Sequence, residues 1–309
     1  MRRTLIALLS LLTAGAMLAV VPPSSAASKY PVPYDFLASA VRAGADVDAD
    51  PPGANDFGCR PSRRHPRPVV LVHGTGGNKN TNWQTYAPLL ANNGYCVFAL
   101  TYGVTAGTPK GLDQVGGMDK METSARQLRA FVKRVRHATG ARKVDLVGHS
   151  QGTLMPNYWV KFLGGARFVR RYVSLAPLWH GTGGNDSLSQ AMAVFGPQAQ
   201  TTPVCAACPQ MSTGSTFLRK MRRGGVAVKG IDYTNIMTKY DQLVIPYTSG
   251  REKRMRNIVV QSRCEKDYSE HFEIAADPVA AAYVLNALDP GHPRKVPCTI
   301  VLPFNGPPA

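Results

Sequence analysis

The chain has 309 residues and a formal net charge of +17, from 36 Lys and Arg against 19 Asp and Glu. This length is enough for one large domain with a full hydrophobic core. The basic residues lie in small clusters at 60–67, 133–136, 219–223 and 251–256, none of which is interleaved with aromatic residues. The pattern argues against nucleic-acid binding. It indicates a solvated basic face, or a surface attracted to anionic lipid or cell wall.

The first 26 residues have the three parts of a secretory signal. Two arginines precede an apolar run at 5–21, and small residues then lead to a cleavage site at Ala26, with Ala27 as the neighbouring alternative. The other interpretation of this run is an uncleaved anchor. No later stretch approaches the ~20 apolar residues of a membrane span. We therefore expect a secreted chain without a transmembrane segment, folded as one domain over 27–309.

After an irregular arm at 28–66, strands and helices alternate along the chain. This alternation is typical of a parallel sheet wound by crossover helices, and no second domain is visible. Asn82, Asp119 and Asp277 are the expected N-caps of three of the helices. The strands are expected at 68–72, 95–100, 143–147, 168–176, 231–237 and 257–261, and the helices at 82–92, 119–140, 153–163 and 277–288.

The alternation breaks between 178 and 230, where Gly, Ser, Thr and Gln are frequent. We expect this insertion to cover part of a substrate pocket, the alternative being surface decoration. It contains no long amphipathic helix of the kind that forms a hinged lid. Its apolar side chains are numerous enough to line an acyl pocket, unless they are simply core. They include Leu188, Met192, Val194, Phe195, Met211 and Phe217.

The most informative motif lies at 144–152, where an apolar strand runs into Gly-x-Ser-x-Gly just before a helix. A serine on this sharp turn has its hydroxyl exposed above the sheet. The flanking glycines are needed because a Cβ there would collide with the neighbouring strand or helix. Ser150 is therefore the expected nucleophile, the alternative being an ordinary strand-to-helix turn.

A serine hydroxyl needs a base to take its proton and a carboxylate to orient that base. With this elbow, the order along the chain is Ser, then Asp or Glu, then His. His271 follows the strand at 257–261 and precedes the last helix, where the base is needed. His180 comes before the later strands, and His292 after the last helix.

Asp241 is the expected acid because it directly follows the strand at 231–237, at the same edge of the sheet as Ser150. Asp232 begins that strand and so lies at the opposite edge, while Asp267 is a candidate local partner of His271. The oxyanion of an acyl-transfer intermediate also needs hydrogen-bond donors. Those expected are the backbone N–H groups of Gln151 and of Thr75, whose hydroxyl is a candidate third donor.

Six cysteines in an exported chain favour three disulfides, although six residues allow 15 pairings. Cys205 and Cys208 are better interpreted as a structural bridge than as a redox pair, because no βαβ pattern adjoins them. Zinc binding is disfavoured because no second Cys/His pair stands at ligand spacing. The cysteines are Cys59, Cys96, Cys205, Cys208, Cys264 and Cys298.

Together these motifs resemble a secreted α/β-hydrolase-fold lipase. They are similar to lipase B of the Candida antarctica type and its actinomycete-like relatives. The similarity covers about 31–298 and consists of motifs in the same order rather than of continuous identity. The resemblance implies a mostly parallel sheet with helices on both faces, with Ser150, Asp241 and His271 as the triad and Thr75 and Gln151 at the oxyanion hole. It also implies Cys59–Cys96 and Cys264–Cys298 bridges, leaving Cys205–Cys208.

Two departures from that family are visible. The elbow has Gly148-His149 where lipase B carries Thr-Trp, and the segment 178–230 differs in length and content. The expected activity is hydrolysis of acyl esters or lipids without a metal or organic cofactor. The alternatives are a short-chain esterase, cutinase, polyester hydrolase or acyltransferase, or a catalytically silent binding protein on the same fold.

Overall fold

The computed structural model describes residues 30–46, 48–109, 113–183 and 205–308. The expected signal segment 1–26 lies outside these residues, as do Leu188, Met192, Val194 and Phe195 of the insertion. Within the described part of the chain, no helix is long and apolar enough to cross a membrane.

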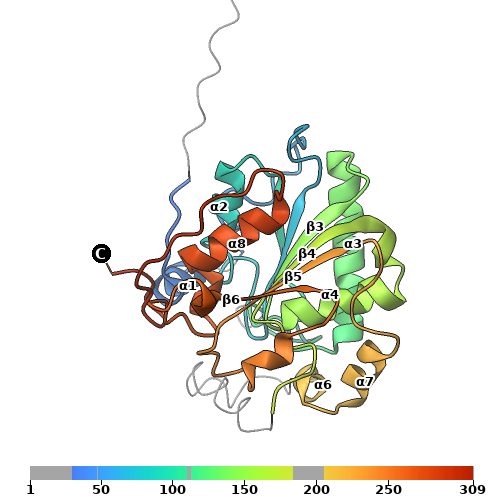
Figure 1. Ribbon diagram of the computed structural model, residues 1–309. Coiled ribbons are helices and arrows are strands. Elements are labelled where there is room, and N and C mark those ends of the chain that lie inside the picture. The colour runs from blue at the N-terminus through green and yellow to red at the C-terminus, as the bar shows by residue number, and fades with distance from the viewer. Residues whose placement is uncertain (1–29, 47, 110–112, 184–204, 309) are drawn as a thin grey trace, which may run out of the picture.

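Six parallel strands form one sheet, in the order β2-β1-β3-β4-β5-β6 (Figure 1). Short β-branched runs favour strands, and parallel strands buried on both faces are apolar throughout. The reversal of chain order beside β1 is the kind of switch point where α/β sheets place ligand sites. The strands are β1 Val69–Val72, β2 Val97–Leu100, β3 Val144–His149, β4 Val169–Leu175, β5 Asp232–Met237 and β6 Arg256–Val259.

Helices cover both faces of the sheet, as Figure 1 shows, with α3 and α4 on one side and α2 and α8 on the other. Alternate residues of β1 enter the two cores: Val70 and Val72 enter one, and Val69 and Leu71 the other. The helices are α1 Phe36–Gly44, α2 Tyr86–Asn92, α3 Met121–Thr139, α4 Gln151–Phe162, α6 Cys208–Met211, α7 Thr216–Arg222 and α8 Pro278–Leu288.

Two of the three expected N-caps are wrong. Helix α2 begins at Tyr86 after Thr85, so Asn82 is not its cap. Helix α3 follows Lys120, and the Asp119 carboxylate accepts only the neighbouring N–H of Lys120. Asp277 is confirmed, because its carboxylate accepts N–H bonds from Val279 and Ala280 at the start of α8.

The arm expected to be irregular contains helix α1. The Asp35 carboxylate caps it by accepting the Ser39 N–H. Its buried residues are Ser39 and Ala43, whereas Leu37 and Val41 are exposed. Apolar residues do stand at helical spacing, at Phe36, Leu37, Ala40 and Val41, but this stripe does not coincide with the buried face of the helix.

The described end of the insertion is ordered around α6 and α7. Phe217, Leu218 and Met221 are buried in the core formed with α4. The backbone of Thr182 bonds to Met211 and Thr213, which joins the two described ends of the insertion. Phe217 is therefore part of the core, while α6 lies at the edge of the site described below.

Candidate active site

Ser150 lies on the sharp turn between β3 and α4, with φ 54° and ψ −124°. This backbone conformation is one that side-chain-bearing residues rarely adopt. A Cβ on Gly148 would lie 2.0 Å from the Gly152 carbonyl oxygen, and one on Gly152 would lie 2.0 Å from the Val72 carbonyl oxygen. Both flanking positions therefore admit only glycine, for the steric reason expected from the motif.

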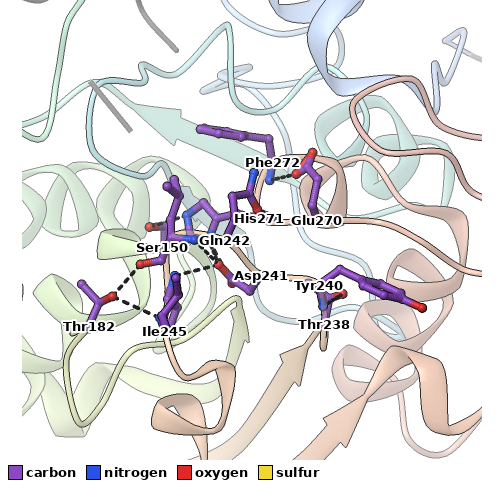
Figure 2. Close-up of polar contacts among 12 residues, drawn as sticks. Ser150, Thr182, Thr238, Tyr240, Asp241, Gln242, Ile245, Glu270, His271 and Phe272 are labelled. Carbon is purple, nitrogen blue, oxygen red and sulfur yellow. Dashed lines mark hydrogen bonds and ion pairs between the residues drawn. The ribbon is translucent and has the colours of Figure 1, made fainter. Parts of the chain in front are cut away.

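Ser150, His271 and Asp241 form one hydrogen-bonded chain, shown in Figure 2. The distance from Ser150 Oγ to His271 Nε2 is 2.9 Å. On the other side of the ring, His271 Nδ1 lies 2.9 and 3.0 Å from the two carboxylate oxygens of Asp241. Three segments far apart in sequence thus meet at the carboxyl edge of the sheet.

The loop after β5 holds the Asp241 carboxylate in place. Its Oδ1 accepts the backbone N–H groups of Leu243, at 3.0 Å, and Val244, at 2.7 Å. The neighbouring Gln242 accepts the backbone N–H of His271 through Oε1, at 3.1 Å. Both Asp241 and His271 are buried, so water competes little for their mutual hydrogen bonds.

The residues expected to form an oxyanion hole are also adjacent. Thr75 Oγ1 donates to Gln151 Oε1 at 2.5 Å, and Met211 of α6 lies against the same hydroxyl. Gln151 is the first residue of α4, and the first N–H groups of a helix have no intrahelical partner. The Thr75 hydroxyl donates to Gln151 in this structure, so it reaches an oxyanion only if that bond is broken.

A sequence model of the class 2 lipases matches residues 66–284, which include every residue of this site. The chain belongs to the class 2 lipase family. Triacylglycerol lipases of Pseudarthrobacter phenanthrenivorans and Burkholderia plantarii are each 36% identical over 96 residues, 29% of this chain. These alignments span 27% and 24% of the two relatives, about a quarter of their length.

Solved structures establish the α/β-hydrolase fold of this lipase family member. Lipase B of Aspergillus fumigatus has a TM-score of 0.59 at 18% identity, covering 80% of this chain and 56% of its own. The mature Bacillus licheniformis lipase BlEst2 has a TM-score of 0.54 at 17% identity, covering 74% of this chain and 94% of its own.

The other candidate residues named from the sequence lie outside the Ser150–His271–Asp241 chain. His180 contacts Glu252, and His292 contacts Asp289 on an exposed loop. Asp232 pairs with Arg170 at the start of β5. Asp267 is buried and accepts the Ser269 N–H, so its carboxylate is not the partner of His271.

Sequence reasoning missed two further residues of the site, His149 and Asn82. His149 Nε2 lies 2.8 Å from the backbone carbonyl oxygen of His271. Asn82 Oδ1 accepts the Gly74 N–H and lies 3.1 Å from His149 Nδ1. The position of His149, a polar residue directly before Ser150, could have identified it from the sequence. No sequence feature indicated that Asn82 belongs to the site.

Burial keeps the neighbouring histidines of the site neutral. Loss of hydration, with the nearby His271 as a smaller cause, lowers the pKa of His149 to about 3. Burial likewise lowers the pKa of His73 to about 4. Within the described residues, no group of three His, Cys, Asp or Glu side chains is arranged to hold a metal ion.

Proposed function

We propose that this class 2 lipase is a serine carboxylic-ester hydrolase, lipase-like, acting through an acyl-enzyme. The observation that carries the proposal is the unbroken chain from Ser150 Oγ through His271 to Asp241. Such a chain lets a neutral hydroxyl act as a nucleophile, because the base and its orienting carboxylate are already in place.

In the first half of the reaction, Ser150 Oγ attacks the ester carbonyl carbon while His271 Nε2 takes the hydroxyl proton. Asp241 stabilises the imidazolium through the Nδ1–H bond. The tetrahedral intermediate collapses when His271 returns the proton to the alkoxy oxygen, which leaves as the alcohol. Water then attacks the acyl-enzyme by the same route and releases the acid and free Ser150.

The oxyanion of each intermediate is proposed to accept the backbone N–H groups of Thr75 and Gln151. The Thr75–Gln151 hydrogen bond supports this assignment because it fixes the loop after β1 against the start of α4. Fixed donors at such a position are worth about 10²–10³ in rate. The reaction needs no cofactor.

The experiment is a chain-length series of p-nitrophenyl esters together with emulsified triglyceride, with and without a serine-directed phosphonate. Hydrolysis abolished by covalent labelling of Ser150 supports the proposal. Cleavage of only the shortest esters indicates an esterase, and cleavage of polyesters a cutinase-like hydrolase. Transfer of the acyl group to an added alcohol in preference to water indicates an acyltransferase. Failure of the phosphonate to react overturns the proposal in favour of a silent binding protein.

We also propose that the chain is secreted after removal of residues 1–26, leaving one domain over 27–309. Three disulfides, Cys59–Cys96, Cys205–Cys208 and Cys264–Cys298, support an oxidising compartment. They are also the three pairs that the resemblance implies. Sequencing the N-terminus of protein from the medium tests the cleavage, and an intact Met1 would contradict it.

The basic face is proposed to attract an anionic lipid surface. In the described residues 120–183 and 205–229, the only acidic side chains are Glu122 and Asp145, and Asp145 is buried. Exposed cations on α3 and α7 include Arg129, Lys133, Arg219 and Arg222. Cosedimentation with anionic but not zwitterionic vesicles, lost at high salt, is the expected result. Equal binding to both contradicts it.

A further inference from the structure

His149, at the end of β3, is buried beside the base without belonging to the triad. Its ring centroid lies 5.1 Å from that of His271 and 6.3 Å from that of Phe36. The imidazole is 2% exposed. A polar ring in such a position costs free energy unless it makes hydrogen bonds that the fold uses.

The hydrogen-bond roles of His149 follow from its neighbours. Nε2 lies 2.8 Å from the His271 carbonyl oxygen, and a carbonyl can only accept. Nδ1 lies 3.1 Å from Asn82 Oδ1, which already accepts the Gly74 N–H. Burial keeps the ring neutral, so it has one proton for two acceptors. The shorter contact takes it, and Nε2–H donates to His271.

This bond completes a clamp on the backbone of the base. The N–H of His271 donates to Gln242 Oε1, and its carbonyl accepts from His149 Nε2. The side chain is then aligned between Asp241 and Ser150. His271 lies in a loop between 3-10 helices rather than in a strand, and within the described residues these two contacts are the hydrogen bonds that its own backbone N–H and carbonyl make.

Helix α1 protects the clamp from water. Phe36 packs on Phe272, with ring centroids 5.6 Å apart, and its backbone N–H donates to Glu273. The loop that bears His271 is therefore held by α1 through Phe36 and by β3 through His149. Inside such a shielded site a hydrogen bond is stronger than in water.

We propose that His149 is a positioning residue, whose Nε2–H holds the His271 backbone so that the base stays within reach of Ser150. The inference rests on the proposed serine mechanism. Because His271 moves a proton in both acylation and deacylation, displacing it slows both steps alike. The turnover number then falls while the Michaelis constant stays nearly unchanged.

Three substitutions separate positioning from packing. His149→Phe keeps a ring but removes the donor. His149→Gln places an amide N–H near the position of Nε2, whereas His149→Asn places one only near Nδ1. We expect kcat to fall about ten- to hundredfold in the Phe and Asn variants, as for a small displacement of a catalytic group. The Gln variant is expected to stay within about threefold of wild type, with KM within about twofold for all three.

His65→Phe is the matched control, since His65 is also buried and its ring contacts that of Tyr95 away from the site, with ring centroids 3.8 Å apart. It should leave kcat unchanged. The rate of phosphonate labelling of Ser150 gives a second measurement that needs no substrate, and it should fall with kcat in the Phe and Asn variants. If His149→Phe fails to fold, the Gln and Asn variants carry the comparison.

Equal activity of the Gln and Asn variants, or wild-type labelling by the Phe variant, would overturn the inference. An effect confined to KM would overturn it too. If wild-type protein itself is not labelled by the phosphonate, the serine mechanism has failed instead. The two failures are therefore distinguishable.

Discussion

At the residue scale, the site stores backbone strain at Ser150, the proposed nucleophile. Ser150 is one of four described non-glycine residues with positive φ, together with Asn55, Ala176 and Phe304. The surrounding glycines and the bond from the Ser150 N–H to the Leu175 carbonyl oxygen hold it there. Such a conformation costs about 1–3 kcal/mol, which the rest of the fold must offset.

Ser150→Ala is expected to lower ester hydrolysis by at least about 10³-fold while changing stability little. Ser150→Gly should be equally inactive but more stable than the Ala variant by about 1 kcal/mol, because glycine accepts the positive φ despite its entropic cost. Urea denaturation and p-nitrophenyl butyrate turnover check both parts. An alanine variant that keeps more than about a tenth of wild-type turnover contradicts the role of Ser150.

The roles of the two loop histidines are testable in the same assay. His271→Ala should be as damaging as Ser150→Ala, and Asp241→Asn somewhat less so, since the serine and the base both remain in place. His292→Ala is the control because His292 is exposed and its ring pairs with Asp289, outside the site. Loss of activity in the control with retention in His271→Ala would mean that the base has been misassigned.

At the element scale, the position of the base depends on loops rather than on the sheet. The Cys264–Cys298 bond closes the segment that holds His271 and α8, with a sequence separation of 34. The Cys205–Cys208 bond spans a separation of 3. A longer closed loop removes more entropy from the unfolded chain.

Replacing Cys264 and Cys298 by serine is expected to lower the free energy of unfolding by about 3–4 kcal/mol. The same change at Cys205 and Cys208 should cost only about 2 kcal/mol, which makes it the matched control. Equilibrium denaturation of both variants without reductant measures the difference. Equal losses would show that loop length does not set the contribution.

At the scale of the whole molecule, buried carboxyl groups around the base make stability depend on pH. Glu273 is buried between α1 and the base loop, and burial raises its pKa from 4.5 to about 8. Its Oε1 has no hydrogen-bond partner within the part of the chain that the structure describes. Burial also raises the pKa of Asp267 and of Asp277, which lie close together.

Because the folded pKa of Glu273 is the higher one, folding favours its protonated form. The contribution of protonated Glu273 to folding stability is fully present below pH 4.5 and is lost as the pH rises towards 8. Glu273→Gln should therefore be more stable than wild type by about 5 kcal/mol at pH 9, with little difference near pH 4. Glu265→Gln, at an exposed position, is the control. A Gln variant that is no more stable at pH 9 contradicts the raised pKa.

At this scale, access to the site is expected to limit which acyl chain lengths the protein accepts. The sequence predicts a pocket for medium acyl chains without a hinged lid, although part of the insertion lies outside the described residues. We expect little change in specific rate as tributyrin passes its solubility limit, measured by titration of released acid. A jump of about tenfold or more at that limit would mean that a closing lid exists.

The sequence by itself predicts where the strands lie along the chain and which serine is the nucleophile. These features are local: an apolar run specifies a buried strand, and the glycines around Ser150 specify the only turn that fits there. The sequence also predicts that Ser150, Asp241 and His271 lie close together. Each follows a strand, and parallel strands bring their carboxyl ends to one edge of the sheet.

Only the tertiary structure decides the rest of the site. Hydrophobic periodicity does not show how helix α1 packs, because its apolar residues Leu37 and Val41 are exposed while Ser39 and Ala43 are buried. Asn82 has a sequence context that favours a helix cap, yet it contacts Gly74 and His149 instead. The contact between His149 and the His271 backbone joins residues 122 positions apart. No local pattern encodes such a contact, because it exists only where the packed sheet brings the two loops together.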